Sequence, residues 1–410
     1  MKLTALCLLL LFSSALHARR IDVGPGLPVK SLRSGLALAA PGDTVLLHRG
    51  TYREGNIVLR QPVSIFGVDG PLLDGEAKYQ QLTITGSAIR VRGLRFTRTG
   101  FSSMNDQAAI GIIDANHILV EQNEIRESFF AIHAANVRSS VIRNNTVVGT
   151  PRTEQTSGNG IHLWKCTDML VAANDVQGHR DGIYFEFVTG STISGNRSHG
   201  NIRYGLHFMF SNRDAYVDNH FYENGAGVAV MYSQHVLMQR NEFARNWGPN
   251  AYGLLLKEIS DARILENRFE TNTVGILMES TNRVGVGRNV FRANGWALRI
   301  SASCNDNTVQ YNSFTANSFD VATNGTLMLN RFHRNYWDKY EGYDLDRNGI
   351  GDVPYHPVSL YSMVIEQNPP AAILMRSFMV SLLDKAEKAL PGLTPEGMAD
   401  EQPLLKPLPL

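Results

Sequence analysis

Residues 264–276 read I-L-E-N-R-F-E-T-N-T-V-G-I, and variants of this unit fill the chain from about residue 116 to residue 337. An asparagine recurs in these copies at intervals of 18 to 29 residues. The members of this series are Asn123, Asn145, Asn174, Asn196, Asn219, Asn241, Asn267, Asn289, Asn312 and Asn330. A second asparagine often follows five positions later, as at Asn272 and Asn335. The middle of the chain is therefore a repeat array.

The period of this array is compatible with two repeat folds, a leucine-rich horseshoe and a parallel β-helix. A horseshoe needs a regular leucine frame, whereas this unit places β-branched or aromatic residues at alternating positions. We therefore predict an all-β fold, a right-handed parallel β-helix whose coils stack about 4.8 Å apart. The recurring asparagines are expected to form scaffold ladders at the turns and to take no part in catalysis.

Length and charge limit the remaining possibilities. The chain has 410 residues, and a solenoid can use that length as one unit because each coil contacts only its neighbours. Its 39 Lys and Arg residues balance 38 Asp and Glu residues. A nucleic-acid-binding protein needs a basic surplus, so no nucleic-acid partner is expected.

The first 18 residues have the pattern of a secretory signal peptide, with Lys2, an apolar run and a small-residue exit. The alternative is a buried N-terminal helix. Two cysteines remain after cleavage, Cys166 and Cys304, which share a repeat position six coils apart. That separation is roughly 29 Å, which is too far for a disulfide. We predict export to a periplasm and two buried free thiols, with a metal-ligand role for one of them as the alternative.

Residues 19–355 are predicted to form the β-helix, with a short N-terminal capping helix at 32–40 and a C-terminal capping loop. Residues 356–410 are predicted to be a linker, an apolar helix at 371–390 and a flexible Pro-rich tail. An arginine and an aspartate interrupt the apolar helix, so it does not suit a membrane span. We expect it to dock on the last coil or on a partner through Ile373, Leu374, Phe378, Met379 and Leu382.

The period-two alternation of strands predicts which side chains leave the coil, counting from each recurring Gly-Ile pair. One outward position holds His133, His162, Tyr184, His207, Ala229, Leu255 and Leu277. The next outward position holds Ala135, Trp164, Glu186, Met209, Met231, Lys257 and Glu279. His207 and Met209 would share one strand, and Met231 would lie beside Met209 on the next coil. Imidazole and thioether donors suit Cu(I), although methionines and neighbouring apolar residues also suit a partner-docking surface.

A candidate calcium loop follows the last coil. Its ligands would be Asp344, Asp346, Asn348 and Asp352, which match positions 1, 3, 5 and 9 of a calcium-binding loop. Position 12 is Tyr355, where a bidentate glutamate is expected. The alternative is a cap rich in Asx turns, whose carboxylates accept hydrogen bonds from backbone amides.

Five segments together resemble the NosD family of periplasmic maturation factors of nitrous oxide reductase. They are P-G-D-T-V-L-L-H-R-G-T-Y-R-E-G (41–55), Y-G-L-H-F-M-F-S-N (204–212), G-V-A-V-M-Y-S (227–233), N-Y-W-D-K-Y-E-G-Y-D-L-D-R-N-G-I-G-D-V-P-Y (335–355) and P-P-A-A-I-L-M-R-S-F (369–378). The resemblance covers essentially the whole mature chain. It implies a right-handed parallel β-helix.

The resemblance also implies a non-catalytic function. Such a protein sits on the NosFY ABC transporter, receives copper from the NosL chaperone and serves copper-centre assembly in nitrous oxide reductase, with sulfur as a further cargo. Membrane contact would occur only through the transporter, by way of the apolar helix. The matching motifs place the metal ligands at His207, Met209 and Met231, with Glu186 and His162 as weaker additions.

A polysaccharide-binding or polysaccharide-modifying protein is the alternative, since many right-handed β-helices are lyases, epimerases or hydrolases. That chemistry needs paired carboxylates, or a basic residue beside a bound uronate. The candidates are Glu186 with Asp181, and Arg180 as a carboxylate clamp.

Overall fold

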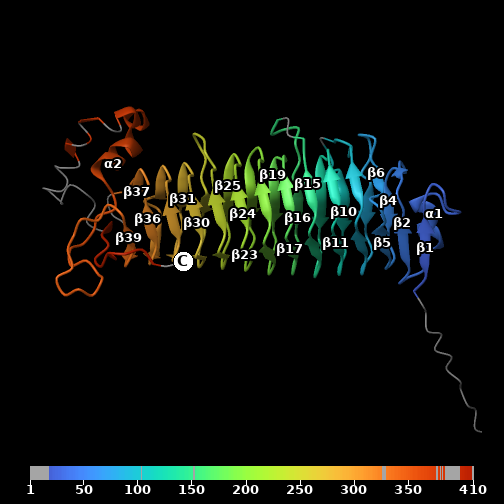
Figure 1. Cartoon of the computed structure of the whole chain (residues 1–410), viewed down its shortest axis with the longest axis horizontal. Helices are drawn as coiled ribbons and strands as arrows, with labels where there is room; N and C mark the ends of the chain where they lie inside the picture. The colour runs from blue at the N-terminus through green and yellow to red at the C-terminus, as the bar shows by residue number, and fades with distance from the viewer. Residues whose placement is uncertain are drawn as a thin grey trace, which may run out of the picture.

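The chain coils into a long rod of parallel strands, with the N-terminal coils at one end and the C-terminal coils at the other (Figure 1). This computed structural model describes residues 18–102, 104–150, 153–325, 329–374, 377–378, 380, 382–383 and 398–408. Nearly the whole predicted signal peptide lies outside these residues. Apart from the first pair, β1 with β2, hydrogen-bonded neighbours are strands three apart in sequence, which gives three parallel sheets. The predicted parallel β-helix is confirmed.

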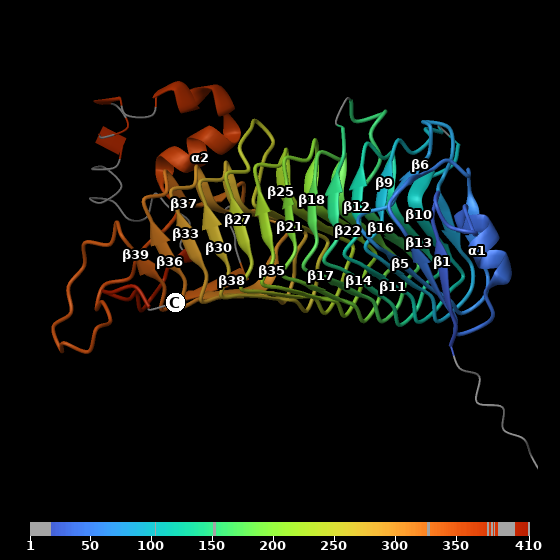
Figure 2. The same ribbon diagram turned by 45° about the vertical axis from the view of Figure 1, so that its right-hand side comes forward.

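Each sheet, here named A, B or C, forms one wall of the coil (Figure 2). Sheet A contains β1 (Arg20–Val23), β2 (Thr44–Leu47), β5 (Ser64–Gly67), β8 (Arg90–Arg92), β11 (Leu119–Glu121), β14 (Val141–Arg143), β17 (Leu170–Ala172), β20 (Thr192–Ser194), β23 (Ala215–Val217), β26 (Leu237–Gln239), β29 (Arg263–Leu265), β32 (Gly285–Gly287), β35 (Asn305–Gln310) and β38 (Leu329–His333). Sheet B contains β3 (Thr51–Tyr52), β6 (Leu72–Asp74), β9 (Arg95–Thr97), β12 (Glu124–Arg126), β15 (Thr146–Val148), β18 (Asp175–Gln177), β21 (Arg197–His199), β24 (His220–Tyr222), β27 (Glu242–Ala244), β30 (Arg268–Glu270), β33 (Val290–Arg292), β36 (Ser313–Thr315) and β39 (Tyr336–Trp337). Sheet C contains β4 (Ile57–Leu59), β7 (Leu82–Ile84), β10 (Ala108–Ile113), β13 (Phe130–Ala135), β16 (Ile161–Trp164), β19 (Asp181–Glu186), β22 (Tyr204–Met209), β25 (Ala226–Met231), β28 (Leu254–Lys257), β31 (Val274–Glu279), β34 (Trp296–Ile300) and β37 (Phe319–Thr323).

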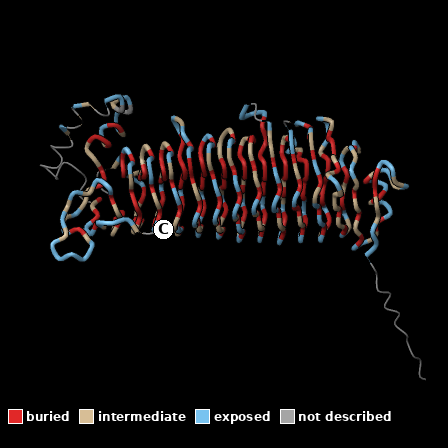
Figure 3. Tube along the Cα trace, in the orientation of Figure 1, coloured by how far each residue is buried: buried red, intermediate tan, exposed pale blue. Residues whose placement is uncertain are grey.

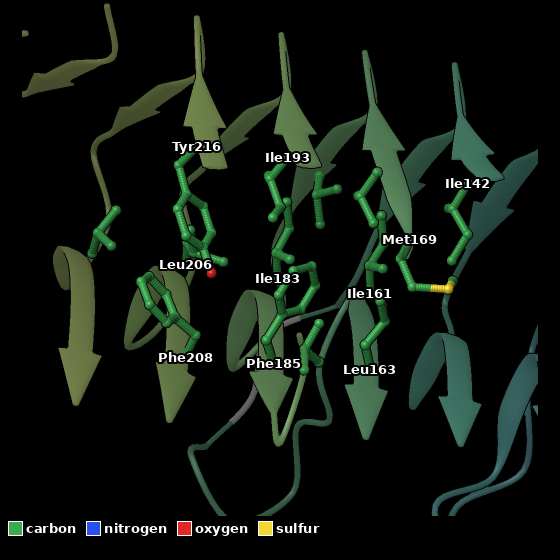
Figure 4. Close-up of a cluster of buried hydrophobic side chains, with 14 of the residues drawn as sticks. Ile142, Ile161, Leu163, Met169, Ile183, Phe185, Ile193, Leu206, Phe208 and Tyr216 are labelled. Atoms are coloured by element: carbon green, nitrogen blue, oxygen red, sulfur yellow. The ribbon is translucent and has the colours of Figure 1, made fainter. Parts of the chain in front are cut away.

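The alternating apolar residues of the repeat meet inside the rod, and buried residues alternate with more exposed ones along many strands of sheets A and B (Figure 3). Figure 4 shows part of this core, with Phe185, Phe208 and Tyr216 beside aliphatic side chains. Rings from successive coils stack in sheet B, from Phe243 through Phe269 to Phe291, with centroids 4.6 and 4.9 Å apart. Identical positions on successive coils therefore build a continuous core.

The predicted asparagine ladder lies at a turn of the coil and is buried. Asn241 Nδ2 donates to Asn267 Oδ1 at 3.0 Å and to the carbonyl of Tyr216 at 2.9 Å. Its own Oδ1 accepts from Asn219 N and Nδ2. The ladder continues from Asn312 to Asn335, so the placement of Asn330 in this series was wrong. Asn330 instead accepts from Asn307 N and Nδ2 at 3.2 and 2.9 Å, in a separate pair that lies five residues ahead of this ladder.

The N-terminal cap is confirmed. Helix α1 (Leu32–Leu38) begins at Ser31, whose side chain accepts a hydrogen bond from Ser34 N, and its Leu32 is fully buried. Figure 2 shows α1 at the N-terminal end of the rod, beside β1. A helix in this place shields the open end of the first coil from pairing with other strands.

The predicted helix at 371–390 lies mostly outside the described residues, and the structure describes a shorter helix before it. Helix α2 (Leu360–Gln367) begins earlier, because Ser359 caps it, and it is followed by the 3-10 helix η1 (Pro369–Leu374). Two successive prolines at the start of η1 lack backbone N–H donors and prevent one continuous helix. Tyr361 and Ile365 of α2 pack against Phe319 of β37. Within the described residues, the helices are too short or too polar to span a bilayer.

The tail was predicted to be flexible, and this is wrong for residues 398–408. Met398 is buried, and Leu404 pairs with Tyr336 beside the last coil. Asp400 ends the asparagine ladder, since its Oδ2 accepts from Asn335 N, Asn335 Nδ2 and Trp337 Nε1 at 2.9 to 3.1 Å. A carboxylate can accept several such bonds at once. That ability explains how a distant segment is held at the end of the rod.

Candidate functional site

The outer face of sheet C has the register that the sequence predicts. His207 of β22 lies between Tyr184 of β19 and Ala229 of β25. Met209 lies between Glu186 and Met231 on the same three strands. Because paired strands lie about 4.8 Å apart, His207, Met209 and Met231 are within one coil of one another. The structure therefore brings these three predicted ligands together.

His207 is outside the main core, yet it is 6% exposed. The side chain therefore leaves the coil, as its register predicts, but its neighbours cover it. The rings of Tyr204 and Tyr184 cover it, with centroids 4.8 and 5.0 Å from the imidazole. Met209 and Met231 remain partly exposed. The three side chains thus form a half-covered group in which the imidazole is buried and the methionines are partly exposed.

A buried ion pair lies behind His207. Asp181 is fully buried, and Arg203 donates to its two carboxylate oxygens at 2.8 and 2.6 Å. His207 Nδ1 lies 3.5 Å from Asp181 Oδ2. Burial by itself raises the pKa of Asp181, but Arg203 and His207 outweigh it and hold that pKa below its usual range. A permanent negative charge therefore faces the imidazole.

The ring nitrogens of His207 have no hydrogen-bond partner in the described part of the chain. Buried polar atoms are normally paired, and unpaired ones concentrate at functional sites. Tyr184 Oη donates to Glu186 Oε2 at 3.4 Å and lies 3.9 Å from Met209 Sδ. An imidazole nitrogen that has no hydrogen-bond partner and lies beside two thioethers suits a soft ion such as Cu(I). Glu186 lies at the rim of this donor set.

His162 does not join this donor set. It lies two coils away on β16, with the ring of Tyr184 between it and His207. Its neighbour is His133 of β13, at a ring distance of 4.8 Å. Burial chiefly, and then the neighbouring His133, lower the pKa of His162 to about 3. Its imidazole is therefore neutral at physiological pH.

Sequence reasoning missed the residues that enclose the site. Tyr204 was quoted in a motif without a role, and Arg203 was not considered. Their place beside Asp181 could have been inferred from the strand register. Asp181 and Tyr204 are register partners at the starts of β19 and β22, and Arg203 directly precedes Tyr204. Tyr252 adds a further ring from two coils on, across the small side chain of Ala226, 6.3 Å from that of Tyr204. It comes from an irregular loop that the repeat does not predict.

An exposed stack of aromatic side chains borders the donor set. Phe187, Phe210 and Tyr232 directly follow Glu186, Met209 and Met231, and each adopts a positive φ of 50 to 55°. Their rings stack with centroids 5.2 and 5.0 Å apart. Each side chain is 36 to 44% exposed. Such a run of exposed rings is typical of a contact surface.

The predicted docking residues lie in the C-terminal segment and are exposed where the structure describes them. Ile373 and Phe378 are 88% and 83% exposed, and Leu374 and Leu382 are 48% and 49% exposed. Met379 lies outside the described residues. This segment lies beside β37, the last strand of sheet C, and leaves these apolar side chains exposed.

The candidate calcium loop brings Asp344, Asp346 and Asp352 together, with ligand atoms within 4.8 Å of one another. Asp344 accepts from the backbone amides of Asn348 and Gly349, and Asp352 accepts from that of Leu345. The loop therefore has the Asx-turn bonding of the alternative prediction. A calcium ion would have to compete with these amides for the carboxylates.

The arrangement expected of a polysaccharide enzyme is not supported. Asp181 is held in its ion pair with Arg203, and Arg180 donates to Asn159 Oδ1 at 3.2 Å. A general acid or base needs a free proton site within reach of substrate. Asp181 is too enclosed for that role. Glu186 has no second carboxylate beside it on sheet C, where Trp164 and Met209 are its register partners.

Several solved structures share the fold. The catalytic unit of an α-1,3-glucanase from Streptomyces thermodiastaticus has a TM-score of 0.59 at 13% identity, covering 75% of this chain and 65% of that chain. The A-module of mannuronan C-5 epimerase AlgE6 from Azotobacter vinelandii has a TM-score of 0.53 at 14% identity, covering 75% and 89%. At these identities the likeness establishes the β-helix fold alone.

Comparison by sequence is more specific. A family model described as "Periplasmic copper-binding protein (NosD)" matches residues 144–342, which include Glu186, His207, Met209 and Met231. Two proteins named "Probable ABC transporter binding protein NosD" match nearly the whole chain. The one from Pseudomonas aeruginosa is 29% identical over 91% of this chain and 90% of its own, and the one from Stutzerimonas stutzeri is 25% identical over 98% and 94%. The resemblance predicted from the motifs is therefore confirmed, and the chain is similar to the NosD proteins over nearly its whole length.

Proposed function

We propose that this chain is a periplasmic copper-handling protein that works on an ABC transporter and passes Cu(I) toward the copper centre of nitrous oxide reductase. The observation that carries the proposal is the donor set of His207, Met209 and Met231 on adjacent strands. The description of the matched family and the names of the two relatives support the copper and transporter parts of the proposal.

The geometry suits transient binding of the ion. Of the two ring nitrogens of His207, Nδ1 faces Asp181, which would orient the ring and leave Nε2 for copper. Met209 and Met231 are partly exposed and could transfer the ion to an incoming donor. Three soft donors with an open side bind Cu(I) less firmly than a closed four-coordinate site. Glu186 at the rim would attract the cation.

Two surfaces are assigned to partners in this proposal. The exposed apolar residues Ile373, Leu374, Phe378 and Leu382 would contact the membrane subunit of the transporter, NosFY in the resembled family. The stack of Phe187, Phe210 and Tyr232 borders the donor set and would receive the copper donor, NosL in that family. Sulfur is a further cargo in this proposal, and the donor set does not exclude it.

Copper binding can be measured directly on the purified mature chain under reducing conditions, in competition with a chromophoric Cu(I) chelator. We expect about one Cu(I) per chain, and about 100-fold weaker binding, or about 2.7 kcal/mol, after His207→Ala combined with Met209→Ala. Met104→Leu is the matched control, because Met104 is 90% exposed and distant in sequence from the site. Unchanged affinity in the double variant would refute the site.

A further inference from the structure

A second group of metal-ligating side chains lies two coils toward the N-terminus from the copper donor set. It consists of His133 on β13, His162 on β16 and Asp106 in the loop before β10. One ligand atom of each lies within 4.8 Å of the others. His133 and His162 are register partners on the outer face of sheet C. Their spacing is therefore fixed by the strand pairing.

The buried member of this group has unsatisfied bonding capacity. His162 is 9% exposed, and both of its ring nitrogens are without a hydrogen-bond partner among the described residues. The ring of Phe130 lies 5.6 Å from that of His162 and 5.8 Å from that of His133 and encloses the pair on an apolar side. An imidazole held in such a place without partners is destabilising unless a ligand satisfies it.

The other members give access to the site. His133 is partly exposed, and Asp106 is exposed. A cation could therefore enter from solvent past the carboxylate and reach the enclosed imidazole. Asp106 precedes the repeat array, so the group combines an irregular loop with two regular strands. The ordinary alternative is that water molecules satisfy His162, and a binding measurement separates the two cases.

We propose that Asp106, His133 and His162 bind a divalent transition-metal ion, at a site separate from the Cu(I) donor set. Two imidazoles and one carboxylate suit borderline ions such as Zn²⁺ and Cu²⁺. They lack the thioethers that favour Cu(I) and the many oxygen ligands that Ca²⁺ requires. The ring of Tyr184 separates the two sites, with centroids 4.6 Å from His162 and 5.0 Å from His207. The proposal does not depend on the proposed copper function.

Zinc and Cu²⁺ binding to the untagged mature chain tests this proposal, by equilibrium competition against a chromophoric chelator. We expect one Zn²⁺ per chain, with at least tenfold weaker binding in His133→Gln and in Asp106→Asn. His133→Gln is suited to this test because the side chain is partly exposed, and circular dichroism checks its folding. His117→Gln, an exposed histidine on a neighbouring turn, is the control and should bind zinc as the parent does.

Two further measurements keep this site distinct from the copper site. Met209→Ala should weaken Cu(I) binding and leave zinc affinity unchanged. Electron paramagnetic resonance of the Cu²⁺-loaded protein should show coupling to two imidazole nitrogens, and to fewer in His133→Gln. Absence of zinc binding, or equal affinity in the parent and His133→Gln, would overturn the proposal and leave water as the occupant.

Discussion

The asparagine ladder and the outer face of sheet C both bury polar side chains, but they satisfy them differently. In the ladder, Asn241 donates two hydrogen bonds and accepts two. On sheet C, His162 and His207 are also buried, but their ring nitrogens make no hydrogen bond within the described chain, and the nearest contact of His207 Nδ1 is Asp181 Oδ2 at 3.5 Å. Both regions repeat on the same coils, so the fold does not cause the difference. The ladder therefore satisfies its own polar groups, whereas the outer face leaves ring nitrogens without a protein partner among the described residues.

Breaking the ladder is expected to destabilise the protein at every pH. Asn241→Ala would leave Asn219 N and the carbonyl of Tyr216 without their partners in the interior. We expect the free energy of unfolding to fall by about 3 kcal/mol, because each buried unsatisfied group costs about 1 to 3 kcal/mol. Urea denaturation measures this, and Asn250→Ala, at an exposed turn, is the control. An unchanged midpoint would mean that the ladder is not a source of stability.

A second prediction concerns Asp214, a buried carboxyl group at a turn of the coil with one unpaired oxygen. Asp214 accepts one bond from Ser191 N, while its Oδ2 has no partner in the described chain. Burial raises its pKa to about 8. The native carboxyl therefore keeps its proton between about pH 4 and pH 8, where the unfolded chain releases it. Over that range stability should fall by about 1.4 kcal/mol per pH unit.

Asp214→Asn should remove that pH dependence. Asn307 occupies the equivalent corner of a later coil and donates to a backbone carbonyl there, so asparagine fits this position. The variant should match the parent near pH 4 and exceed it increasingly up to pH 8. Thermal unfolding at several pH values gives the comparison, with the exposed Asp218→Asn as control. Parallel curves for parent and variant would contradict the assignment.

The smallest effect has the opposite sign from the first. His162→Phe should stabilise the metal-free chain by about 1 kcal/mol, because it replaces unpaired nitrogens with an apolar ring among Phe130, His133 and Tyr184. The same variant should lose zinc binding. Denaturation in a chelator-treated buffer measures the stability change. If the free energy of unfolding instead falls by 1 kcal/mol or more, water or protein groups already satisfy His162. The polar side chains of sheet C would then be paired, as those of the ladder are.

Regular parts of the molecule could be predicted from the sequence because they depend on a repeated local unit. Counting from the recurring pairs of glycine and an apolar residue, Gly205-Leu206 and Gly227-Val228 on these coils, predicted the register of His207, Met209 and Met231. The burial of His207 could not be foreseen, since it depends on rings at strand starts and on Tyr252 from an irregular loop. The roles of Asp106 and Asp400 could not be predicted for the same reason. Both lie outside the repeat and meet it only in three dimensions.

The carboxylate of Asp400 has a consequence for assembly. An asparagine at the end of the series would expose an amide N–H able to continue bonding into a further molecule, as in fibrils built from asparagine stacks. Asp400 receives the donors of the final coil and has none to pass on. The ladder thus ends at a side chain that has no N–H donor, so it offers no amide with which a second molecule could extend the ladder end to end.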